Sequence, residues 1–168
     1  MYDLIIKNAN IVDGTLRKSF NADIAILEDT IVRRGKNLGK AKYYYDAQGL
    51  TLCPGIIDIH THYDAQLTWD PKALPSLDLG VTTAIIGNCG FTIAPCRVED
   101  RDLNMRNLQK VEGMSYEALK KGIDWSFNTY QEYLRLLESK KLFLNVCSFI
   151  GHSALRIWCM GEDAMQRE

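Results

Sequence analysis

Two histidines that could bind a metal ion end an apolar run, Cys53-Pro-Gly-Ile-Ile-Asp-Ile-His-Thr-His62. The run predicts a β-strand, and side chains alternate between the two faces of a strand. We therefore expect Asp58, His60 and His62 on one face and, on the other, Ile57, Ile59 and Thr61. Imidazoles arranged in this way lie roughly 6–7 Å apart at their Cβ atoms, close enough to share one metal ion. The alternative is a half-exposed strand whose polar side chains face water.

A cysteine could supply a third ligand. Cys89 lies in Gly87-Asn-Cys-Gly90, at the end of the apolar run 81–88. Neighbouring parallel strands lie about 4.8 Å apart, so Cys89 is expected within reach of His60 and His62 if the two runs pair. A thiolate is a good zinc ligand, and a nearby cation lowers the pKa of a thiol. Alternatively, Cys89 is a buried thiol with a packing role.

Other polar residues near these runs have ordinary structural explanations. His152 could contact a substrate, but a histidine bonded to a backbone carbonyl is the favoured interpretation. Asp58 could orient a histidine or be a satisfied polar group, and Asp64 is either a loop-capping residue or a contact to loops around the site. Cys96 is interpreted as structural, because its spacing from Cys89 is wider than in zinc knuckles. Three arginines lie among acidic residues and are expected to form surface ion pairs rather than bind a substrate carboxylate: Arg97, Arg101 and Arg106.

The composition indicates a globular protein without a nucleic-acid or membrane partner. The chain has 168 residues, a formal net charge of −1 and 46% hydrophobic residues, which is enough apolar material for a core. The sequence has no basic stripe of the kind that binds nucleic acid, and no apolar stretch long enough to span a bilayer. The N-terminus lacks the features of a signal peptide. The five cysteines are an odd number at irregular positions, which favours a reducing, cytoplasmic location over a disulfide framework.

Residues 1–54 are predicted to form a small antiparallel β unit, interpreted as a portion of a β-sandwich. Residues 2–13 are β-rich, and residues 22–32 contain two short strand candidates around a turn at positions 28–29. The three tyrosines at 43–45 indicate a further strand, in which aromatic side chains face both sides of a sheet.

Residues 55–168 change to strands that alternate with helices, which is typical of a parallel sheet in an α/β fold. The strand candidates are residues 56–62, 81–88 and 142–150. Their nearly continuous apolar character is expected of strands that are covered on both faces.

A long helical stretch is predicted between the second and third of these strands, over about residues 100–140. Ser115 could cap one of its helices, and Thr129 with Glu132 predicts a capping box for another. An apolar stripe at helical spacing follows that box and is interpreted as core packing: Tyr130, Tyr133, Leu134 and Leu137.

These elements predict an α/β fold that is part of a barrel. A (β/α)8 barrel of TIM type needs roughly 250 residues, whereas only three strand candidates follow residue 55 here. We therefore predict an incomplete barrel containing the first three strands, preceded by the small β unit, and we expect the chain to be an N-terminal fragment of a larger protein. An open three-stranded sheet would expose a long edge and apolar surface.

The sequence resembles the N-acyl-D-amino-acid deacylases of the metal-dependent amidohydrolase superfamily. The superfamily resemblance rests on the segments Asp3–Gly14 and Pro54–His62. The resemblance to the deacylases rests on His62-Tyr-Asp-Ala-Gln66, Gly87-Asn-Cys-Gly-Phe-Thr-Ile-Ala-Pro95 and shorter matches that continue to Arg156. A pair of histidines alone is weakly specific, but its combination with the G-N-C-G segment is strongly specific.

The resemblance implies a zinc site with one or two ions, bound by His60, His62 and a bridging Cys89 in place of the carboxylated lysine of other relatives. A water molecule activated by the metal would attack the acyl carbonyl of an N-acylated D-amino acid, the small-molecule substrate. Two further metal-binding histidines and a general-base aspartate would come from later strands. No catalytic residue is therefore assigned in this chain, no substrate-binding residue is identified, and the chain alone is expected to be inactive.

Two rival interpretations remain. A cyclic-amide hydrolase of the hydantoinase or dihydroorotase type shares the superfamily, but Cys89 and the lack of a candidate lysine ligand disfavour it. A non-catalytic metal-binding remnant is the other rival. The acyl group, the D-amino acid and the oligomeric state have no signature in the sequence.

Overall fold

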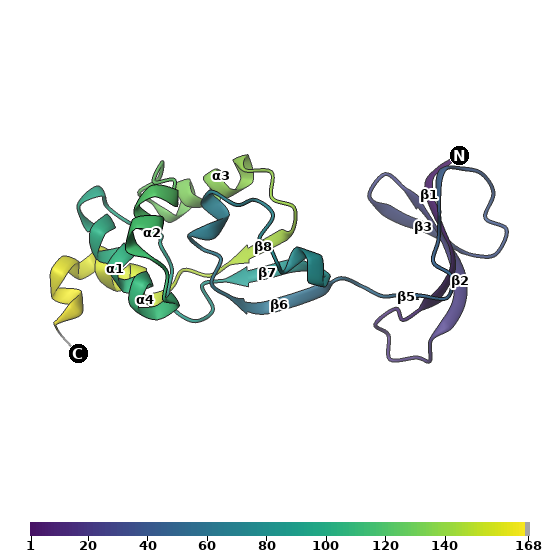
Figure 1. The fold of residues 1–168 in the computed structure, drawn as a ribbon, viewed down its shortest axis with the longest axis horizontal. Coiled ribbons are helices and arrows are strands. Elements are labelled where there is room, and N and C mark those ends of the chain that lie inside the picture. Colours follow the sequence, from purple (N-terminus) through teal and green to yellow (C-terminus); the bar gives the residue numbers. More distant parts are fainter. Residues whose placement is uncertain (167–168) are drawn as a thin grey trace. The chain divides into compact units, whose positions relative to one another are not determined.

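The structure is a computed structural model that describes residues 1–166. The chain has a mixed α/β fold with two compact units, Met1–Pro54 and Gly55–Glu168. Figure 1 shows strands throughout the first unit and both strands and helices in the second. Within the described residues, no helix combines the length and the apolar character needed to cross a membrane.

The first unit is a five-stranded sheet with the order β3-β2-β1-β4, and β5 pairs with the end of β1. An apolar cluster lies on each face: one includes Ala9, Ile11 and Ile24, and the other includes Ile5 and Ala25. The strands are β1 Tyr2–Ile11, β2 Phe20–Leu27, β3 Thr30–Gly35, β4 Ala41–Asp46 and β5 Thr51–Leu52. Strands β2 and β3 are the pair predicted around positions 28–29, and β4 contains the three tyrosines.

The prediction of an antiparallel unit is wrong for part of this sheet. Strand β2 is antiparallel to both β1 and β3, but β4 and β5 are parallel to β1. Residues 36–40 carry the chain back across the sheet, so that β4 starts on the far side of β1 and runs in the same direction. A strand pattern in sequence reports which residues are buried but does not report this crossover.

The second unit contains a parallel sheet with the order β6-β7-β8, as predicted. Its strands are Ile56–Thr61, Val81–Ile86 and Asn145–Ser148. Each strand ends before its predicted boundary. His62 therefore lies in the loop after β6, and Cys89 lies in the loop after β7. The carboxyl ends of parallel strands meet at one edge of a sheet, which brings these two loops together.

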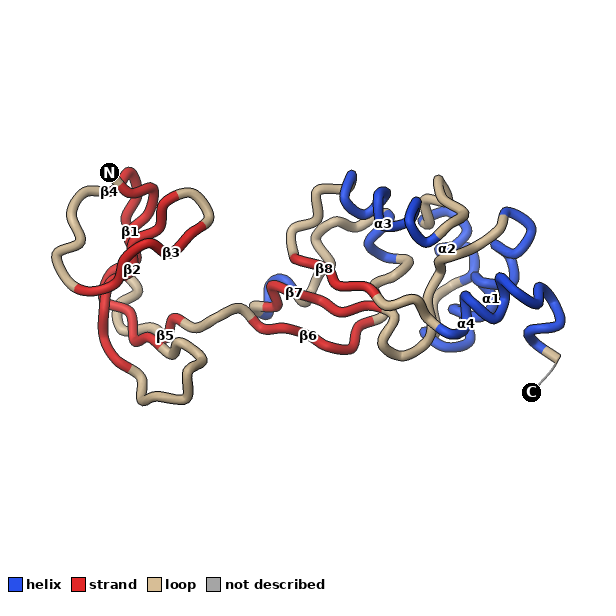
Figure 2. Tube along the Cα trace, turned by 180° about the vertical axis from the view of Figure 1, so that it is seen from behind, coloured by secondary structure: helices blue, strands red, loops and turns tan. Residues whose placement is uncertain are grey.

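Most of the helices of this unit lie between β7 and β8 in sequence. Figures 1 and 2 show them grouped toward the carboxyl ends of the strands. The connection from β6 to β7 contains only two short 3₁₀ turns, Gln66–Thr68 and Leu77–Leu79. The α-helices are α1 Arg101–Glu112, α2 Tyr116–Gly122, α3 Tyr130–Ser139 and α4 His152–Met160, with further 3₁₀ turns at Val98–Asp100 and Gly161–Met165.

Helix α3 begins and packs as predicted. Thr129 accepts a hydrogen bond from the Glu132 backbone N–H, and the Glu132 carboxylate accepts one in return from the Thr129 N–H. Tyr133 and Leu137 are buried in the core, with Tyr130 and Leu134 partly buried against it. Ser115 was expected to cap a helix. It occupies the N-cap position of α2, but its side chain forms no capping hydrogen bond there.

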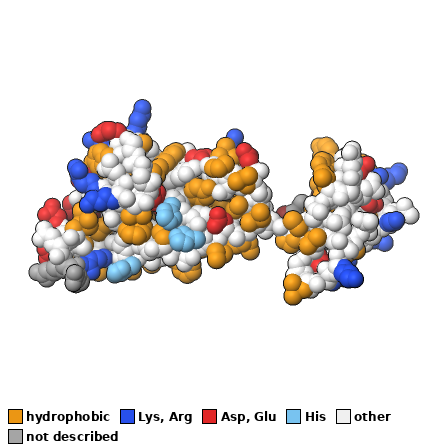
Figure 3. All heavy atoms as spheres, turned by 60° about the horizontal axis from the view of Figure 1, so that its bottom comes forward, with side chains coloured by type: hydrophobic (Ala, Val, Ile, Leu, Met, Phe, Trp, Pro, Cys, Tyr) orange, Lys and Arg blue, Asp and Glu red, His pale blue; other side chains and the backbone are white. Residues whose placement is uncertain are grey.

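One face of the parallel sheet is open, which contradicts the prediction of strands covered on both sides. Ala84 and Ile86 of β7 lie in the core beneath the helices. On the opposite face, Ile57 and Ile59 of β6 are 59% and 63% exposed. Figure 3 shows apolar side chains exposed on the second unit, as predicted for a sheet that carries only three parallel strands.

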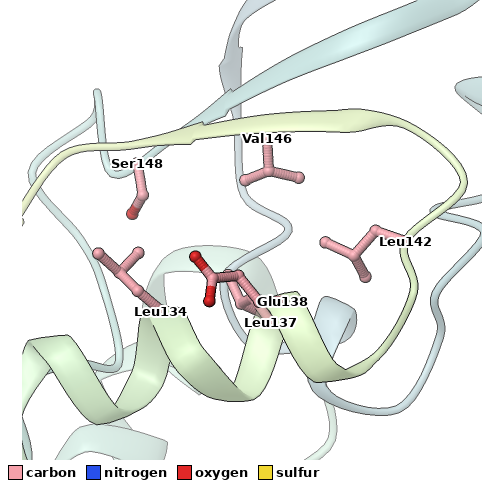
Figure 4. Close-up of a pocket in the computed structure, with 6 residues that line it drawn as sticks. All are labelled: Leu134, Leu137, Glu138, Leu142, Val146 and Ser148. Atoms are coloured by element: carbon pink, nitrogen blue, oxygen red, sulfur yellow. The ribbon is translucent and has the colours of Figure 1, made fainter.

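Helix α3 also leaves a hollow of about 420 Å³ against β8. Figure 4 shows that apolar side chains from both elements face this space, with Glu138 as the one carboxylate among the labelled residues. The hollow contains no group of potential metal ligands, so it offers packing space rather than a catalytic constellation.

The capping box of α3 makes a specific prediction about stability. Replacing Thr129 with Ala removes a cap that is formed, whereas Ser115→Ala removes a hydroxyl that makes no cap. We expect Thr129→Ala to lower the free energy of unfolding by about 1 kcal/mol, within the usual range for N-cap losses. Ser115→Ala is expected to change it by less than about 0.5 kcal/mol. Denaturant titration of both variants checks this, and equal losses would contradict it.

Candidate metal centre

His60, His62 and Cys89 come together as the sequence predicted. Their potential ligand atoms all lie within 4.8 Å of one another. The Nε2 atoms of the two histidines are 3.4 Å apart, and their ring centroids are 5.4 Å apart. Figure 3 shows histidine side chains gathered on the surface of the second unit beside exposed apolar groups.

The predicted alternation of faces along β6 is wrong. Asp58 pairs with Ala84 of β7, but Thr61 pairs with Ile86, so two residues of β6 lie opposite one residue of β7. This register shift is a β-bulge, and it breaks the period of two. Asp58 and Thr61 consequently share the face of Ala84 and Ile86, and Thr61 is buried there. His60 lies within the bulge and is exposed.

The loop that carries Cys89 is fastened to the histidine strand. The Asn88 side-chain amide donates a hydrogen bond of 2.8 Å to the Ile59 carbonyl. The Phe91 backbone N–H donates to the Cys89 sulfur at 3.4 Å, which orients Sγ. The first hydrogen bond links the loop after β7 to the backbone of β6, and the second links two residues of that loop. The position of Cys89 relative to His60 therefore depends on how β6 pairs with β7.

Gly87 allows this loop to pass close to the chain that follows β8. Its φ of +77° is in the left-handed region, and a Cβ atom at this position would lie 2.3 Å from the Phe149 carbonyl oxygen. Gly90 also has a left-handed φ, +87°, but has no atom within 4 Å of a built Cβ. The two glycines are therefore required for different reasons: Gly87 for both conformation and space, and Gly90 for conformation alone.

The donor set fits zinc. Two imidazole nitrogens and a thiolate are typical zinc ligands, and a tetrahedral ion with bonds of about 2.0–2.3 Å holds its ligand atoms roughly 3.3–3.8 Å apart. The histidine nitrogens already have that separation, and the 4.8 Å limit for the group requires only small side-chain movements. A fourth position is open to a further ligand, as in catalytic zinc sites.

Two buried carboxyl groups lie close to His62: Glu112 in space, and Asp64 two residues along the chain. The Asp64 side chain is buried, and within the described residues neither of its oxygens has a hydrogen-bond partner. Burial raises the pKa of Asp64 to about 7, and the negative charge of Glu112 contributes to the rise. Burial likewise raises the pKa of Glu112 to about 7. The Glu112 side chain is 8% exposed, and its Oε1 lies 3.8 Å from Nδ1 of His62.

Sequence reasoning missed the role of this acidic pair. Asp64 lies in the turn after β6, as expected for a loop residue, but it is only 1% exposed, and its backbone carbonyl accepts a 2.9 Å hydrogen bond from buried Tyr133. Glu112 ends α1, far from His62 in sequence. Its charged neighbours on the helix gave no sign that it would point inward, so only the tertiary structure reveals the contact.

The remaining predicted residues divide into confirmed and corrected cases. Asp58 accepts a hydrogen bond of 3.2 Å from the His60 backbone N–H, so it supports the strand rather than an imidazole. His152 is exposed at the start of α4, and in the described part of the chain its ring has no backbone carbonyl partner, which contradicts the expected structural bond. It lines a hollow of about 370 Å³ together with Cys89 and Arg156.

Arg97, Arg106 and Cys96 have the structural roles that the sequence predicted, but the ion pair expected for Arg101 is wrong, because this side chain bonds to backbone carbonyls. Arg97 lies 3.9 Å from Asp100, Arg106 pairs with Asp102, and Arg101 donates to the Trp125 carbonyl. Cys96 is buried, and burial raises the pKa of its thiol to about 11. The Asn104 amide contacts its sulfur at 3.1 Å, away from the histidine pair.

The sequence pattern of the amidohydrolase family matches residues 44–167 of this chain. Among curated proteins, an N-acyl-D-aspartate deacylase from Alcaligenes xylosoxydans xylosoxydans is 33% identical over 95% of the chain, and a D-aminoacylase from the same organism is 29% identical over 92%. The matched region is 30% of the length of each relative. The chain thus spans about a third of the relatives that it matches.

Solved structures agree with these sequence matches. A D-aminoacylase structure, described as defining a novel subset of amidohydrolases, superposes over 99% of the chain with a TM-score of 0.78 and 28% identity. An N-acyl-D-glutamate deacylase from Bordetella bronchiseptica, solved with zinc and a phosphonate inhibitor, covers 98% of the chain with a TM-score of 0.69 and 25% identity. The aligned region is 34% and 35% of those two chains.

Gly87 and Gly90 provide a matched test of the loop geometry. Both substitutions by Ala place a side chain at a left-handed φ, at a cost of about 1–2 kcal/mol. Only Gly87→Ala also forces a Cβ against a backbone oxygen, so we expect it to destabilise the protein by roughly 1–3 kcal/mol more than Gly90→Ala. Denaturant titration measures the difference, and equal effects would show that the contact with Phe149 relaxes freely.

Proposed function

Because this chain belongs to the amidohydrolase family, we propose that it is the metal-binding part of a zinc-dependent hydrolase that cleaves the amide bond of N-acyl-D-amino acids. The products are a carboxylate and a free D-amino acid. The observation that carries this proposal is the convergence of His60, His62 and Cys89 within a fold whose solved neighbours include D-aminoacylase. We further propose that β6, β7 and β8 are the first three strands of a (β/α)8 barrel.

The position of the ligands supports this assignment. His60 lies near the carboxyl end of β6, and His62 and Cys89 follow the ends of β6 and β7, on the face where barrel enzymes place their active sites. Two neutral imidazoles and one thiolate leave a bound Zn²⁺ with a net positive charge. A zinc ion held there supplies Lewis-acid polarisation of an acyl carbonyl and activation of a water molecule. Whether one or two ions bind depends on ligands beyond these three.

The residues around the ligands have supporting roles in this proposal. Asn88 holds the Cys89 loop against β6, and Phe91 presents a backbone N–H to the sulfur. The hollow lined by Cys89, His152 and Arg156 lies beside the ligand group and offers space for part of a substrate. The exposed apolar face of the sheet would line the inside of a completed barrel.

The full catalytic machinery is proposed to require residues beyond those assigned here. The resemblance implies two more histidines and a general-base aspartate from later strands, and the chain matches about a third of its relatives. We therefore propose that these 168 residues bind zinc but do not turn over substrate alone. A cyclic-amide hydrolase is not favoured, because the relatives that cover most of the chain include several N-acyl-D-amino-acid deacylases and because Cys89, rather than a lysine, joins the histidine pair.

The metal ligands can be tested one at a time. His60→Asn, His62→Asn and Cys89→Ser should each lower Zn²⁺ affinity by more than about tenfold, since even groups that only support ligands affect affinity by 10–100-fold. His152→Asn and Cys159→Ser are the matched controls and should bind zinc as the wild type does. Competition with a chromophoric chelator measures the affinities. Zinc binding that is unchanged in all three ligand variants would contradict the proposed centre.

The proposed reaction can be tested by grafting this chain into a complete barrel. A chimera in which it replaces the matching third of a D-aminoacylase should hydrolyse N-acetyl-D-amino acids, because the graft supplies its three ligands and the host supplies the rest of the barrel. Cys89→Ser in the chimera should abolish that hydrolysis. The isolated chain serves as the reference and should show no turnover. A folded, zinc-loaded chimera without activity on either enantiomer would contradict the assigned reaction.

A further inference from the structure

Among the described residues, Glu112 is the acidic group that pairs with the ring of a candidate metal ligand. It ends α1, and its carboxylate Oε1 lies 3.8 Å from Nδ1 of His62. The Glu112 side chain is only 8% exposed, whereas that of His62 is 37% exposed. The carboxylate therefore approaches the imidazole from the protein side of the site.

The two nitrogens of His62 have different surroundings. Its Nε2 faces Nε2 of His60 at 3.4 Å, within the group of potential ligand atoms. Its Nδ1 is directed to Glu112. When one ring nitrogen of a neutral histidine binds a metal, the other nitrogen carries the proton and needs an acceptor. Glu112 is the group in position to accept it.

Glu112 has no competing partner among the described residues. Among the described residues no lysine or arginine forms an ion pair with it; His62 is its ionisable contact, and Asp64 lies near enough for the charge of Glu112 to raise its pKa. A buried carboxylate without a partner is costly. The distance of 3.8 Å is longer than a hydrogen bond, so a movement of about 1 Å is needed to form one. Placing His62 on a metal ion, with its proton fixed on Nδ1, would provide the reason for that movement.

We propose that Glu112 is a positioning residue of the metal centre, and that its carboxylate accepts the Nδ1–H of His62 and so turns Nε2 toward the ion shared with His60 and Cys89. This inference rests on the proposed function, because it presumes the zinc site, and it adds a residue from α1 to a centre otherwise built on two strand ends. Glu112 does not contact the ion in this arrangement, so its effect on zinc is transmitted through His62.

Two variants of Glu112 test the proposal in the full 168-residue chain. Glu112→Leu removes the acceptor and keeps a similar volume, while Glu112→Gln keeps an uncharged carbonyl acceptor. We expect zinc affinity to fall by about tenfold to a hundredfold in the Leu variant and by less in the Gln variant. Glu138→Gln, which removes an exposed carboxylate on α3, is the charge-matched control and should bind zinc normally.

Two further readouts separate positioning from general stability. Without metal, the midpoint temperature of thermal unfolding should be unchanged or higher in Glu112→Leu, because an apolar side chain replaces a buried charge. In ¹⁵N NMR of the zinc-loaded wild type, His62 should show a protonated Nδ1 with slow proton exchange, and this exchange should accelerate in both variants. If Glu112→Leu fails to fold, Glu112→Gln carries the same comparison.

The outcomes distinguish this inference from the proposed function. If wild-type protein does not bind Zn²⁺, both fail. If the wild type binds Zn²⁺, His62→Asn loses it and both Glu112 variants keep full affinity with an unchanged His62 Nδ1–H signal, only the role of Glu112 is overturned. Loss of affinity in parallel with loss of folded structure in both variants would also overturn it, because a purely structural residue behaves in that way.

Discussion

The pairing of β6 with β7 determines where the candidate ligands lie. The register shift between Asp58 and Thr61 adds one residue to β6 opposite Ile85. It keeps Thr61 on the buried side, where its hydroxyl donates to the Ile85 carbonyl at 3.0 Å, and leaves His60 on the open side. The Asn88 bond to Ile59 then ties the Cys89 loop to the bulged segment. A bulge thus re-aims a side chain at a strand end, as bulges often do near active sites.

A second constraint is the cost of the acidic groups close to His62. Asp64 and Glu112 are both removed from water, and the pKa of each is raised to about 7 by burial. Packing alone would favour apolar residues at such positions. Groups with shifted pKa values cluster at functional sites, and structural networks of charged groups also produce such shifts. The Glu112 carboxylate 3.8 Å from the ring of His62 therefore agrees with a cation site formed by His60, His62 and Cys89.

Much of the second unit could be predicted because its signals are local. The capping box of Thr129 and Glu132 and the apolar stripe of α3 depend on neighbours within one helix turn, and both predictions are confirmed. That His60, His62 and Cys89 would lie close together could be predicted from parallel strand pairing, which brings the ends of β6 and β7 to one edge of the sheet. The bulge in β6, the parallel entry of β4 and the approach of Glu112 could not be predicted, because each depends on backbone register or on a contact between segments far apart in sequence.

The close passage of the backbone at Gly87 affects how the G-N-C-G segment should be interpreted. Gly87 has no room for a side chain beside Phe149, and Gly151 is similarly enclosed by Gly90 and Thr92. Purifying selection on packing would preserve these glycines even in a descendant that had lost its metal. In comparisons among distant relatives, Cys89 is therefore the position that reports on metal binding. Gly87 and Gly151 report only on the shared shape of the loop.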